Sequence, residues 1–290
     1  MLSGALAQPG KCCQSRFELL LIFPYIAPDM KLGVKAIGFN RRRFIAALAA
    51  GVPLAVVGES TLVEPAWLKV RTLKLAEKPR YRFLHFTDLH YKGNRAFMQK
   101  VVRKINAAQP EFVCFTGDLI EENRFLGETL EILNGIKAPL FGVPGNHDYW
   151  AKADFGQIQQ AFARTGGAWL VNQNADLSGG KVCLHGLAQL NQAITVKPPL
   201  GRTNILLLHY PLWVESFFDK KFALILAGHT HGGQVRLPGF GPLLLPFDSG
   251  AYDYGLFQTK AGPLYVSSGL GFFSVNVRFN CRPEIVVVEI

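Results

Sequence analysis

Five mainly apolar runs of this 290-residue chain each end in aspartate, asparagine or histidine. One of them, Phe112–Thr116, is followed directly by Gly117 and Asp118. Apolar runs of about six residues bounded by glycine or proline are typical of strands that are buried on both faces. The polar side chains that follow the five runs are Asp88 and His90; Asp118; Asn146, His147 and Asp148; His209; and His229 and His231.

These side chains have the composition of a metal site. In open α/β sheets, ligands bind beyond the carboxyl ends of the strands, which is where all five clusters are expected. Carboxylate, amide and imidazole groups there suit Mn, Fe, Zn or Mg. The pairs Asp88/His90 and His229/His231 are each two residues apart, so in extended backbone both members would share one face. A glycine precedes three of the clusters, where a side chain would crowd the site: Gly117, Gly145 and Gly228.

The order of the motifs resembles that of the calcineurin-like metallophosphoesterase family. The chain carries Asp-x-His at Asp88, Gly-Asp at Gly117, Gly-Asn-His-Asp at Gly145, a lone His209 and Gly-His-Thr-His at Gly228. Each motif is short, but five in this order, each after an expected strand, are specific. The similar domain runs from about residue 81 to the C-terminus. The resemblance implies a hydrolase of phosphate esters that uses two divalent metal ions.

The resemblance also implies a role for each residue of the motifs. One metal ion would be held by Asp88, His90, Asp118 and His231. The other would be held by Asp118, Asn146, His209 and His229, with Asp118 bridging the two. A hydroxide between the metal ions would attack phosphorus in line. His147 would stabilise or protonate the leaving oxygen, and Asp148 would accept the other ring N–H and fix the tautomer.

Two arginines near the C-terminus are further candidates. Arg278 and Arg282 resemble the arginine-rich turn of the exported or membrane-proximal phosphodiesterase branch of that family, where they would contact a substrate phosphate. The alternative, ordinary turn cations before the last strand, stays open. Gly186–Gln189 departs from that branch, which often carries acidic residues here. The departure concerns the substrate contacts and not the metal ligands.

The net charge of +10 does not indicate a nucleic-acid-binding protein. Half of it lies in residues 1–58, and the remainder is scattered without a basic run or a basic-aromatic stripe. No nucleic-acid partner is therefore expected. A mildly basic surface instead favours the approach of an anionic substrate.

The N-terminal segment predicts export. Residues 41–58, three arginines followed by Phe-Ile and an apolar stretch, resemble a twin-arginine signal. The apolar part is shorter than the ~20 residues of a spanning helix, and Pro53 is expected to interrupt a helix. A signal therefore fits better than a permanent span, although an uncleaved anchor and a buried helix without export stay open. Met30 is an alternative start to Met1.

These observations divide the chain into three parts. Residues 1–58 are an extension with the signal or anchor, residues 59–80 a linker, and residues 81–290 the catalytic domain. The domain is expected in the periplasm or on the outer face of the cytoplasmic membrane.

From residue 81 onward, strands and helices alternate and then give way to strands with little helix between them. Helices are expected at Arg95–Ala108, Arg124–Leu133, Ala153–Arg164 and Leu212–Phe218. Strands are expected at 81–87, 111–116, 139–143, 169–171, 182–187, 204–208, 222–227, 264–268 and 285–290. The order predicts an α/β fold, a four-layer α/β/β/α sandwich of two mixed sheets with flanking helices.

The segment Leu237–Phe257 is rich in proline, glycine and leucine and closely follows the histidine pair. It predicts either a lid or lipid-contacting lip, or a loop that folds back on its own core. His85 and His185 match no motif and are expected to be structural. Cys183 and Cys281 could pair in an oxidising compartment.

The sequence thus predicts a two-metal phosphodiesterase acting on a phosphodiester or pyrophosphate bond, with a substrate that could be lipid-linked or associated with the cell wall. An alternative enzyme is a UDP-2,3-diacylglucosamine pyrophosphatase of the lipid A type, which the apolar segment favours and the export signal opposes. A rival of another class is a metal-holding protein that binds cell-wall polymer without turnover. The intact His147–Asp148 pair opposes that reading.

Overall fold

The computed structural model describes residues 40–272 and 274–290, so the expectations about residues 1–39, including the choice between Met1 and Met30, lie outside it. The chain divides into two compact units, residues 1–47 and 48–290. Of the first, residues 40–47 are described, and they open helix α1 (Arg41–Gly58). Helix α1 passes through Pro53, so the expected interruption is wrong.

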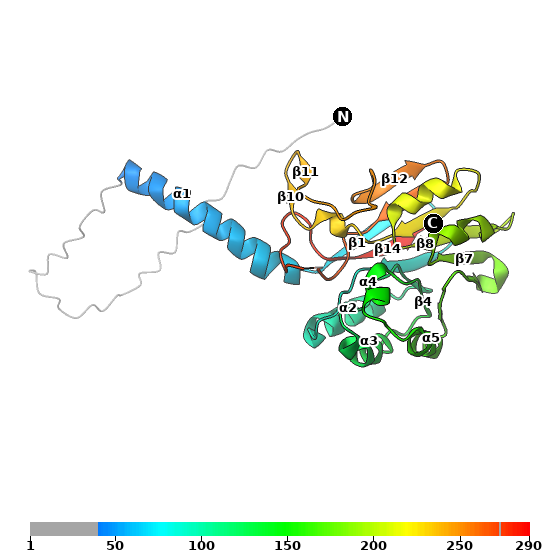
Figure 1. Ribbon diagram of the computed structural model, residues 1–290. Helices are drawn as coiled ribbons and strands as arrows, with labels where there is room; N and C mark the ends of the chain where they lie inside the picture. The colour runs from blue at the N-terminus through cyan, green and yellow to red at the C-terminus, as the bar shows by residue number, and fades with distance from the viewer. Residues whose placement is uncertain (1–39, 273) are drawn as a thin grey trace, which may run out of the picture. The chain divides into compact units, whose positions relative to one another are not determined.

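The second unit is built on two six-stranded sheets (Figure 1). The order in the first sheet is β1 (Lys69–Lys74), β14 (Glu284–Glu289), β2 (Arg82–Phe86), β3 (Val113–Phe115), β4 (Leu140–Gly142) and β5 (Ala168–Trp169). The order in the second is β12 (Gly255–Thr259), β13 (Gly262–Val266), β9 (Leu224–Ala227), β8 (Thr203–Leu208), β7 (Val182–Leu187) and β6 (Asn174–Leu177).

Each sheet contains a block of parallel strands, and in the first sheet β14 pairs antiparallel with β2 beside this block. Strands β2 to β5 form one parallel block, and β13, β9, β8 and β7 form the other. The outer strands β12 and β6 pair antiparallel with their neighbours. Because parallel strands end at the same edge of a sheet, the loops after β2, β3 and β4, and those after β8 and β9, gather at common edges.

Helices cover the outer face of the first sheet. They are α2 (Arg95–Ala107), α3 (Leu126–Leu133) and α5 (Phe155–Arg164). In α2 the buried residues Met98, Val101, Val102 and Ile105 recur at helical spacing, and the side chain of Asn94 caps the first turn by accepting from the amide of Phe97. The helices lie together on one side of the sheet (Figure 1).

Three apolar layers hold the sandwich together. One lies between the helices and the first sheet, a second lies between the two sheets, and a third covers the outer face of the second sheet. The third is closed by the 3-10 helices η5 (Leu190–Thr195) and η6 (Pro211–Phe217). The predicted fold of two mixed sheets with flanking elements is confirmed, with 3-10 helices in place of α-helix in the fourth layer.

The segment expected as a linker contains regular structure. A π-helix, η1 (Glu59–Val63), is followed by a 3-10 helix, η2 (Glu64–Ala66), and then by β1. Strand β1 pairs with β14 in parallel register over six residues, so residues 69–74 are part of the first sheet. The strand was missed because it is an edge strand whose largely exposed, alternating residues form no apolar run.

The remaining elements are short. Helix α4 (Asn146–Trp150) starts at the third polar cluster, and η7 (His231–Gly233) starts at the last. The 3-10 helices η3 (Asn123–Phe125) and η4 (Ser178–Gly180) and the hairpin of β10 (Arg236–Leu237) and β11 (Gly241–Pro242) complete the described elements. The described chain also contains one helical stretch, Arg41–Ala66, that by length and composition alone could cross a membrane.

Candidate metal centre

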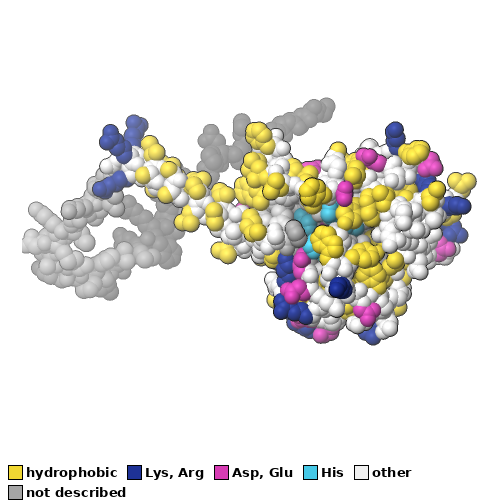
Figure 2. Space-filling model, in the orientation of Figure 1, with side chains coloured by type: hydrophobic (Ala, Val, Ile, Leu, Met, Phe, Trp, Pro, Cys, Tyr) yellow, Lys and Arg dark blue, Asp and Glu magenta, His cyan; other side chains and the backbone are white. Residues whose placement is uncertain are grey.

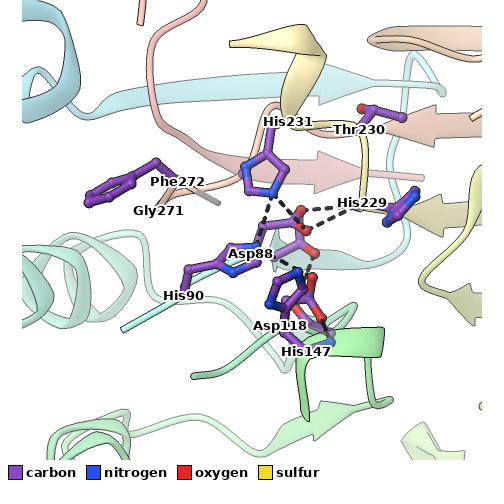
Figure 3. A network of polar contacts seen from close by, with 12 residues as sticks. Asp88, His90, Asp118, His147, His229, Thr230, His231, Gly271 and Phe272 are labelled. Carbon is purple, nitrogen blue, oxygen red and sulfur yellow. Dashed lines mark hydrogen bonds and ion pairs between the residues drawn. The ribbon is translucent and has the colours of Figure 1, made fainter. Parts of the chain in front are cut away.

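The polar clusters converge where the two parallel blocks end. Figure 3 shows residues of four of them close together, and the fifth, His209, lies 3.2 Å from Asp118. Asp88 and His90 follow β2, Asp118 follows β3, and His147 lies in helix α4 after β4. The second sheet contributes the loops after β8 and β9. All nine predicted metal and catalytic residues are buried: Asp88, His90, Asp118, Asn146, His147, Asp148, His209, His229 and His231.

The backbone at the site is in the left-handed region, which non-glycine residues seldom adopt. Five of the predicted ligands have positive φ: Asp88 (52°), His90 (40°), Asp118 (62°), His229 (71°) and His231 (51°). The expectation that each i, i+2 pair shares a face of extended backbone is therefore wrong. The pairs lie in tight turns just past the strand ends, and the surrounding structure holds this strain as it often does at functional sites.

The first group of ligand atoms joins the two sheets. Nε2 of His90 lies 3.0 Å from Nε2 of His231 and 3.3 Å from Oδ2 of Asp118. Nε2 of His231 lies 3.7 Å from Oδ1 of Asp88. The ligand atoms of Asp88, His90 and His231 all fall within 4.8 Å of one another, as a cation requires.

The second group includes Asp118 and Asp88, which also belong to the first. Nε2 of His209 lies 3.2 Å from Oδ2 of Asp118 and 3.0 Å from Oδ1 of Asn146. The ligand atoms of Asp88, Asp118 and His209 again lie within 4.8 Å. Oδ2 of Asp118 thus stands between the imidazoles of His90 and His209, which is the position of a bridging carboxylate.

The ring tautomers aim lone pairs into the cluster. Nδ1 of His209 donates to the carbonyl of Thr116 at 2.7 Å, and Nδ1 of His90 donates to the carboxylate of Glu121. In a neutral ring the opposite nitrogen then carries the lone pair. Both Nε2 atoms face Oδ2 of Asp118, so each ring needs positive charge, either as a ring proton or as a metal ion, between itself and this carboxylate. Such a convergence of acceptors is repulsive unless a cation lies among them, so these residues fit a pair of metal ions.

The charges at the site shift one another's pKa. Burial lowers the pKa of His209, but the carboxylates of Asp118 and Asp88 outweigh it and raise the pKa to about 9. Burial likewise opposes ionisation of Asp118, yet the neighbouring His209 and His90 hold its pKa well below the usual range. The two carboxylates therefore create a strong preference for positive charge at this position.

His229 is placed differently from the other ligands. Its Nε2 lies 2.7 Å from the carbonyl of Phe247, and its backbone amide donates to the carboxylate of Asp88 at 3.0 Å. Nδ1 is therefore the nitrogen that this ring can offer to a cation. Burial, followed by the charge of His209, lowers the pKa of His229 to about 4, so the ring is neutral.

Asp148 was expected to hold the second ring nitrogen of His147, but in the structure Glu121 holds it. The carboxylate of Asp148 accepts from the amides of Asp118 (3.0 Å), Leu119 (2.8 Å) and Gly145 (2.9 Å), so it holds the two loops together. Nδ1 of His147 lies 3.1 Å from Oε1 of Glu121, which also binds His90. The motif pattern missed Glu121. Its sequence signal is an acidic residue three positions beyond Asp118, in the loop after β3.

The two candidate arginines do not reach the cluster. Arg278 is buried, and its guanidinium donates to the carbonyls of Ser268 (3.0 Å), Cys281 (2.9 Å) and Gly271 (2.6 Å). The guanidinium of Arg282 lies over the ring of Trp67, and its Nε donates to the Trp67 carbonyl. The geometry gives both residues structural contacts, since neither side chain joins the converging ligand atoms.

The glycines before the ligands are required by close contacts. A Cβ on Gly145 would lie 2.1 Å from Oδ1 of Asp118, and one on Gly228 would lie 2.6 Å from Oδ2 of Asp88. Gly117 adopts a φ of 100° and approaches the ring of His209. These contacts confirm the expectation that a side chain there would enter the site.

Other sequence candidates lie outside the centre. His85 is buried and its Nε2 lies 2.8 Å from the hydroxyl of Thr116, while His185 lies 3.0 Å from the side-chain oxygens of both Asn174 and Asn204, so both are structural as expected. Cys183 and Cys281 are both free and buried, so the pairing left open by the sequence does not occur. The segment Leu237–Phe257 exposes several large apolar side chains rather than burying them.

With this geometry, the chain belongs to the calcineurin-like phosphoesterase family, whose pattern matches residues 81–233. It is thus a metal-dependent phosphoester hydrolase. It is 30% identical over 282 residues to the uncharacterized metallophosphoesterase YkuE of Bacillus subtilis, covering 86% of this chain and 96% of the relative. It is 27% identical over 268 residues to the phosphodiesterase YaeI of Escherichia coli, covering 87% and 99%. A solved structure, TT1561 of Thermus thermophilus, aligns with a TM-score of 0.46 at 11% identity over 66% of this chain and 90% of that one.

Proposed function

We propose that the protein is a two-metal phosphodiesterase that cleaves a phosphodiester or pyrophosphate bond at this centre. The observation that carries the proposal is the position of Oδ2 of Asp118, within 3.3 Å of the imidazoles of both His90 and His209. One carboxylate oxygen between two groups of ligands is the arrangement of a binuclear site. The phosphodiesterase name of a relative that spans most of the chain supports the choice of substrate class.

Each residue of the centre has a role in this proposal. Asp88, His90, Asp118 and His231 would hold one divalent ion, and Asp118, Asn146, His209 and His229 the other. When bound, such ions supply positive charge that activates water and neutralises the phosphate oxygens. We assign Nε2 of His147 to the leaving oxygen, because Glu121 holds the opposite nitrogen of the ring. The burial of the whole cluster strengthens these electrostatic interactions by excluding water.

The proposal is tested with bis-p-nitrophenyl phosphate and Mn²⁺. The full chain should hydrolyse it. Loss of a residue that only supports a metal ligand lowers activity by roughly 10-fold to 100-fold, so loss of a ligand itself, as in Asn146→Ala, should lower kcat/KM by more than that. Asn123→Ala, an exposed amide at the start of η3, is the matched control and should keep full activity. Absence of turnover with Mn²⁺, Fe²⁺, Zn²⁺ and Mg²⁺ would favour the rival, a wall-binding protein without catalysis.

A second candidate is hydrolysis of a UDP-linked acyl sugar. The specific observation in its favour is the exposed apolar segment after the site, in which Phe240 is 90%, Leu244 82% and Phe247 96% exposed. The carbonyl of Phe247 touches His229, so this segment adjoins the ligands. UDP-2,3-diacylglucosamine would be cleaved to UMP faster than bis-p-nitrophenyl phosphate if this candidate holds, and slower if the simple phosphodiesterase does.

The proposal extends to location. We infer that residues 41–58 export the domain or anchor it at the outer face of the cytoplasmic membrane, because Arg41–Arg43 precede a stretch whose apolar side chains are exposed. A fusion of residues 30–58 to a reporter that is active only after twin-arginine export tests this. Signal in wild type that disappears when Arg42 and Arg43 are both changed to Lys supports export, and cytosolic retention of the unchanged fusion contradicts it.

A further inference from the structure

A cleft with a volume of about 480 Å³ opens directly on the proposed centre. Its floor includes Pro144, Gly145 and the predicted ligand Asn146. Its size falls in the range of small-molecule sites, which is roughly 300–1,000 Å³. Figure 2 shows histidine side chains in a hollow of one face of the domain, with hydrophobic side chains around it. A substituent of a phosphate bound at the centre would therefore enter this cleft.

Aromatic side chains form two walls of the cleft, and each wall starts at an imidazole of the centre. On one side the ring of Trp150 lies 4.6 Å from that of His147. On the other side Tyr210 lies 4.4 Å from His229 and 4.7 Å from Trp213, centroid to centroid. Trp150 is 67% exposed, which is unusual for so large an aromatic side chain.

The lining has no net charge. None of the described residues that line the cleft is Asp, Glu, Lys or Arg, so the lining offers no counter-charge for a second phosphate. Its polar side-chain groups are the amides of Asn146, Gln189 and Asn191, the tyrosine hydroxyls and the indole N–H groups of the tryptophans. An acyl chain would bury these amides without hydrogen-bond partners, which is costly. A planar ring with hydrogen-bonding edges satisfies both the aromatic walls and the amides.

Backbone hydrogen bonds hold the segment that carries the side-chain amides of Gln189 and Asn191. The side-chain oxygen of Asn172 accepts from the amides of Ala188 (2.9 Å) and Gln189 (3.2 Å), so the loop that carries Gln189 and Asn191 is tied to the turn after β5. A loop held in this way keeps its side chains over the cleft at little further cost in conformational entropy.

We propose that this cleft binds an uncharged heteroaromatic ring, such as a nucleobase, that is attached to the phosphate at the centre. The inference rests on the proposed function, because it assigns the ester group of the same substrate. Trp150 and Trp213 are the specificity-determining rings, and Gln189 and Asn191 hydrogen-bond the edge of the base. The preferred substrates are nucleotide-containing phosphoesters.

Two ligands that differ only in the base test the proposal. Uridine 5′-monophosphate and ribose 5-phosphate carry the same phosphate and a ribose, so calorimetric titration of the Mn²⁺-loaded full chain isolates the ring. Stacking on an aromatic side chain contributes about 1–3 kcal/mol per base, which is roughly 5-fold to 150-fold in affinity, so the Kd of the nucleotide should be ~10-fold lower. Equal affinities would overturn the proposal. A gain of the same size for octyl phosphate would overturn it too, since it would make the cleft a site for an apolar chain.

Variants distinguish a loss of ring binding in the cleft from a general loss of stability. Trp213→Ala should remove most of the ~10-fold preference for the nucleotide and leave the affinity for ribose 5-phosphate unchanged, and Trp213→Phe should keep it. Trp67→Ala is the matched control, because Trp67 is a half-exposed tryptophan that stacks on Arg282 outside the cleft. A loss of preference in the control contradicts the assignment.

The two proposals fail in different ways. If bis-p-nitrophenyl phosphate is hydrolysed but the nucleotide binds no better than ribose 5-phosphate, the phosphodiesterase proposal is retained and the ring-site proposal is rejected. If the nucleotide is preferred but no phosphodiester is hydrolysed with any divalent ion, the ring site stands and the enzymatic function falls.

Discussion

Glu121 is the residue that links the two kinds of histidine at the centre. Its Oε1 contacts Nδ1 of His90, a predicted ligand, and Nδ1 of His147, the residue assigned to the leaving oxygen. Burial raises the pKa of Glu121, but the hydrogen bonds to His147 and His90 outweigh it and lower the pKa to about 2. The carboxylate is therefore ionised. Such a carboxylate fixes ring orientation and raises the basicity of the ligand.

Glu121→Gln is therefore expected to lower the affinity for Mn²⁺ and the kcat on bis-p-nitrophenyl phosphate, each by roughly 10-fold to 100-fold. Calorimetric metal titration and steady-state kinetics measure the two effects. Glu122→Gln is the matched control, because that neighbouring carboxylate is exposed and pairs with Arg124. Equal metal affinity in the two variants would remove the role assigned to Glu121.

His85 provides a stability prediction that is separate from the metal centre. Complete burial lowers the pKa of His85 from its ordinary value of 6.5 to about 3, so the ring stays neutral in the folded state. Below pH 6.5 the unfolded chain takes up a proton that the folded chain does not, and stability is lost as the pH falls. The loss is about 1.4 kcal/mol per pH unit, or about 2 kcal/mol between pH 7 and pH 5.

His85→Gln keeps a donor for Thr116 but cannot titrate. The free energy of unfolding from urea titrations should thus fall by about 2 kcal/mol less in the variant than in the wild type between pH 7 and pH 5. If the two proteins lose stability in parallel over this range, His85 is not the group that responds to acid.

At the scale of the element, the sequence predicts the buried central strands but not the exposed edge strands. Central strands such as β8 and β9 are buried on both faces, so their residues form apolar runs that are visible in the sequence. Strand β1 alternates exposed and half-buried side chains, and β6 does the same. Their place in the sheets comes from pairing with β14 and β7, which no local pattern encodes.

The pairing of β1 predicts a loss of stability when that strand is removed. Arg71 of β1 lies 3.1 Å from the fully buried carboxylate of Glu284, and Leu73 is buried. A chain of residues 76–290 should thus melt at a lower temperature than residues 59–290, and the uncovered edge of β14 should promote association. Differential scanning calorimetry and size-exclusion chromatography measure the two effects. If the two chains melt together as monomers, residues 69–74 act as the linker first expected.

For the molecule as a whole, the residues of the candidate centre were predictable because a motif in a loop after a strand specifies both residue type and place. The sequence could not show how the loops bend. The positive φ angles of Asp88 and His231, the contact of His229 with Phe247 and the hydrogen bonds of Asp148 to backbone amides depend on how loops that are distant in the sequence pack together. Glu121 was hidden for the same reason, since its partners come from the loop after β2 and from helix α4 after β4.

The centre joins both halves of the sandwich, so metal ions are expected to stabilise the entire fold. Asp88 and Asp118 come from the first sheet, and His209 and His231 from the second. Ions that bind only the folded state add about 2.7 kcal/mol at 100 times their Kd. For a domain of this size that corresponds to a rise in Tm of about 5–10 °C, which chelation with EDTA should reverse. Asp118→Asn removes the shared charge and should abolish the response to Mn²⁺, while leaving a folded protein with unchanged circular dichroism. A response to Mn²⁺ that persists in this variant would place the ion elsewhere and would remove Asp118 as the bridge.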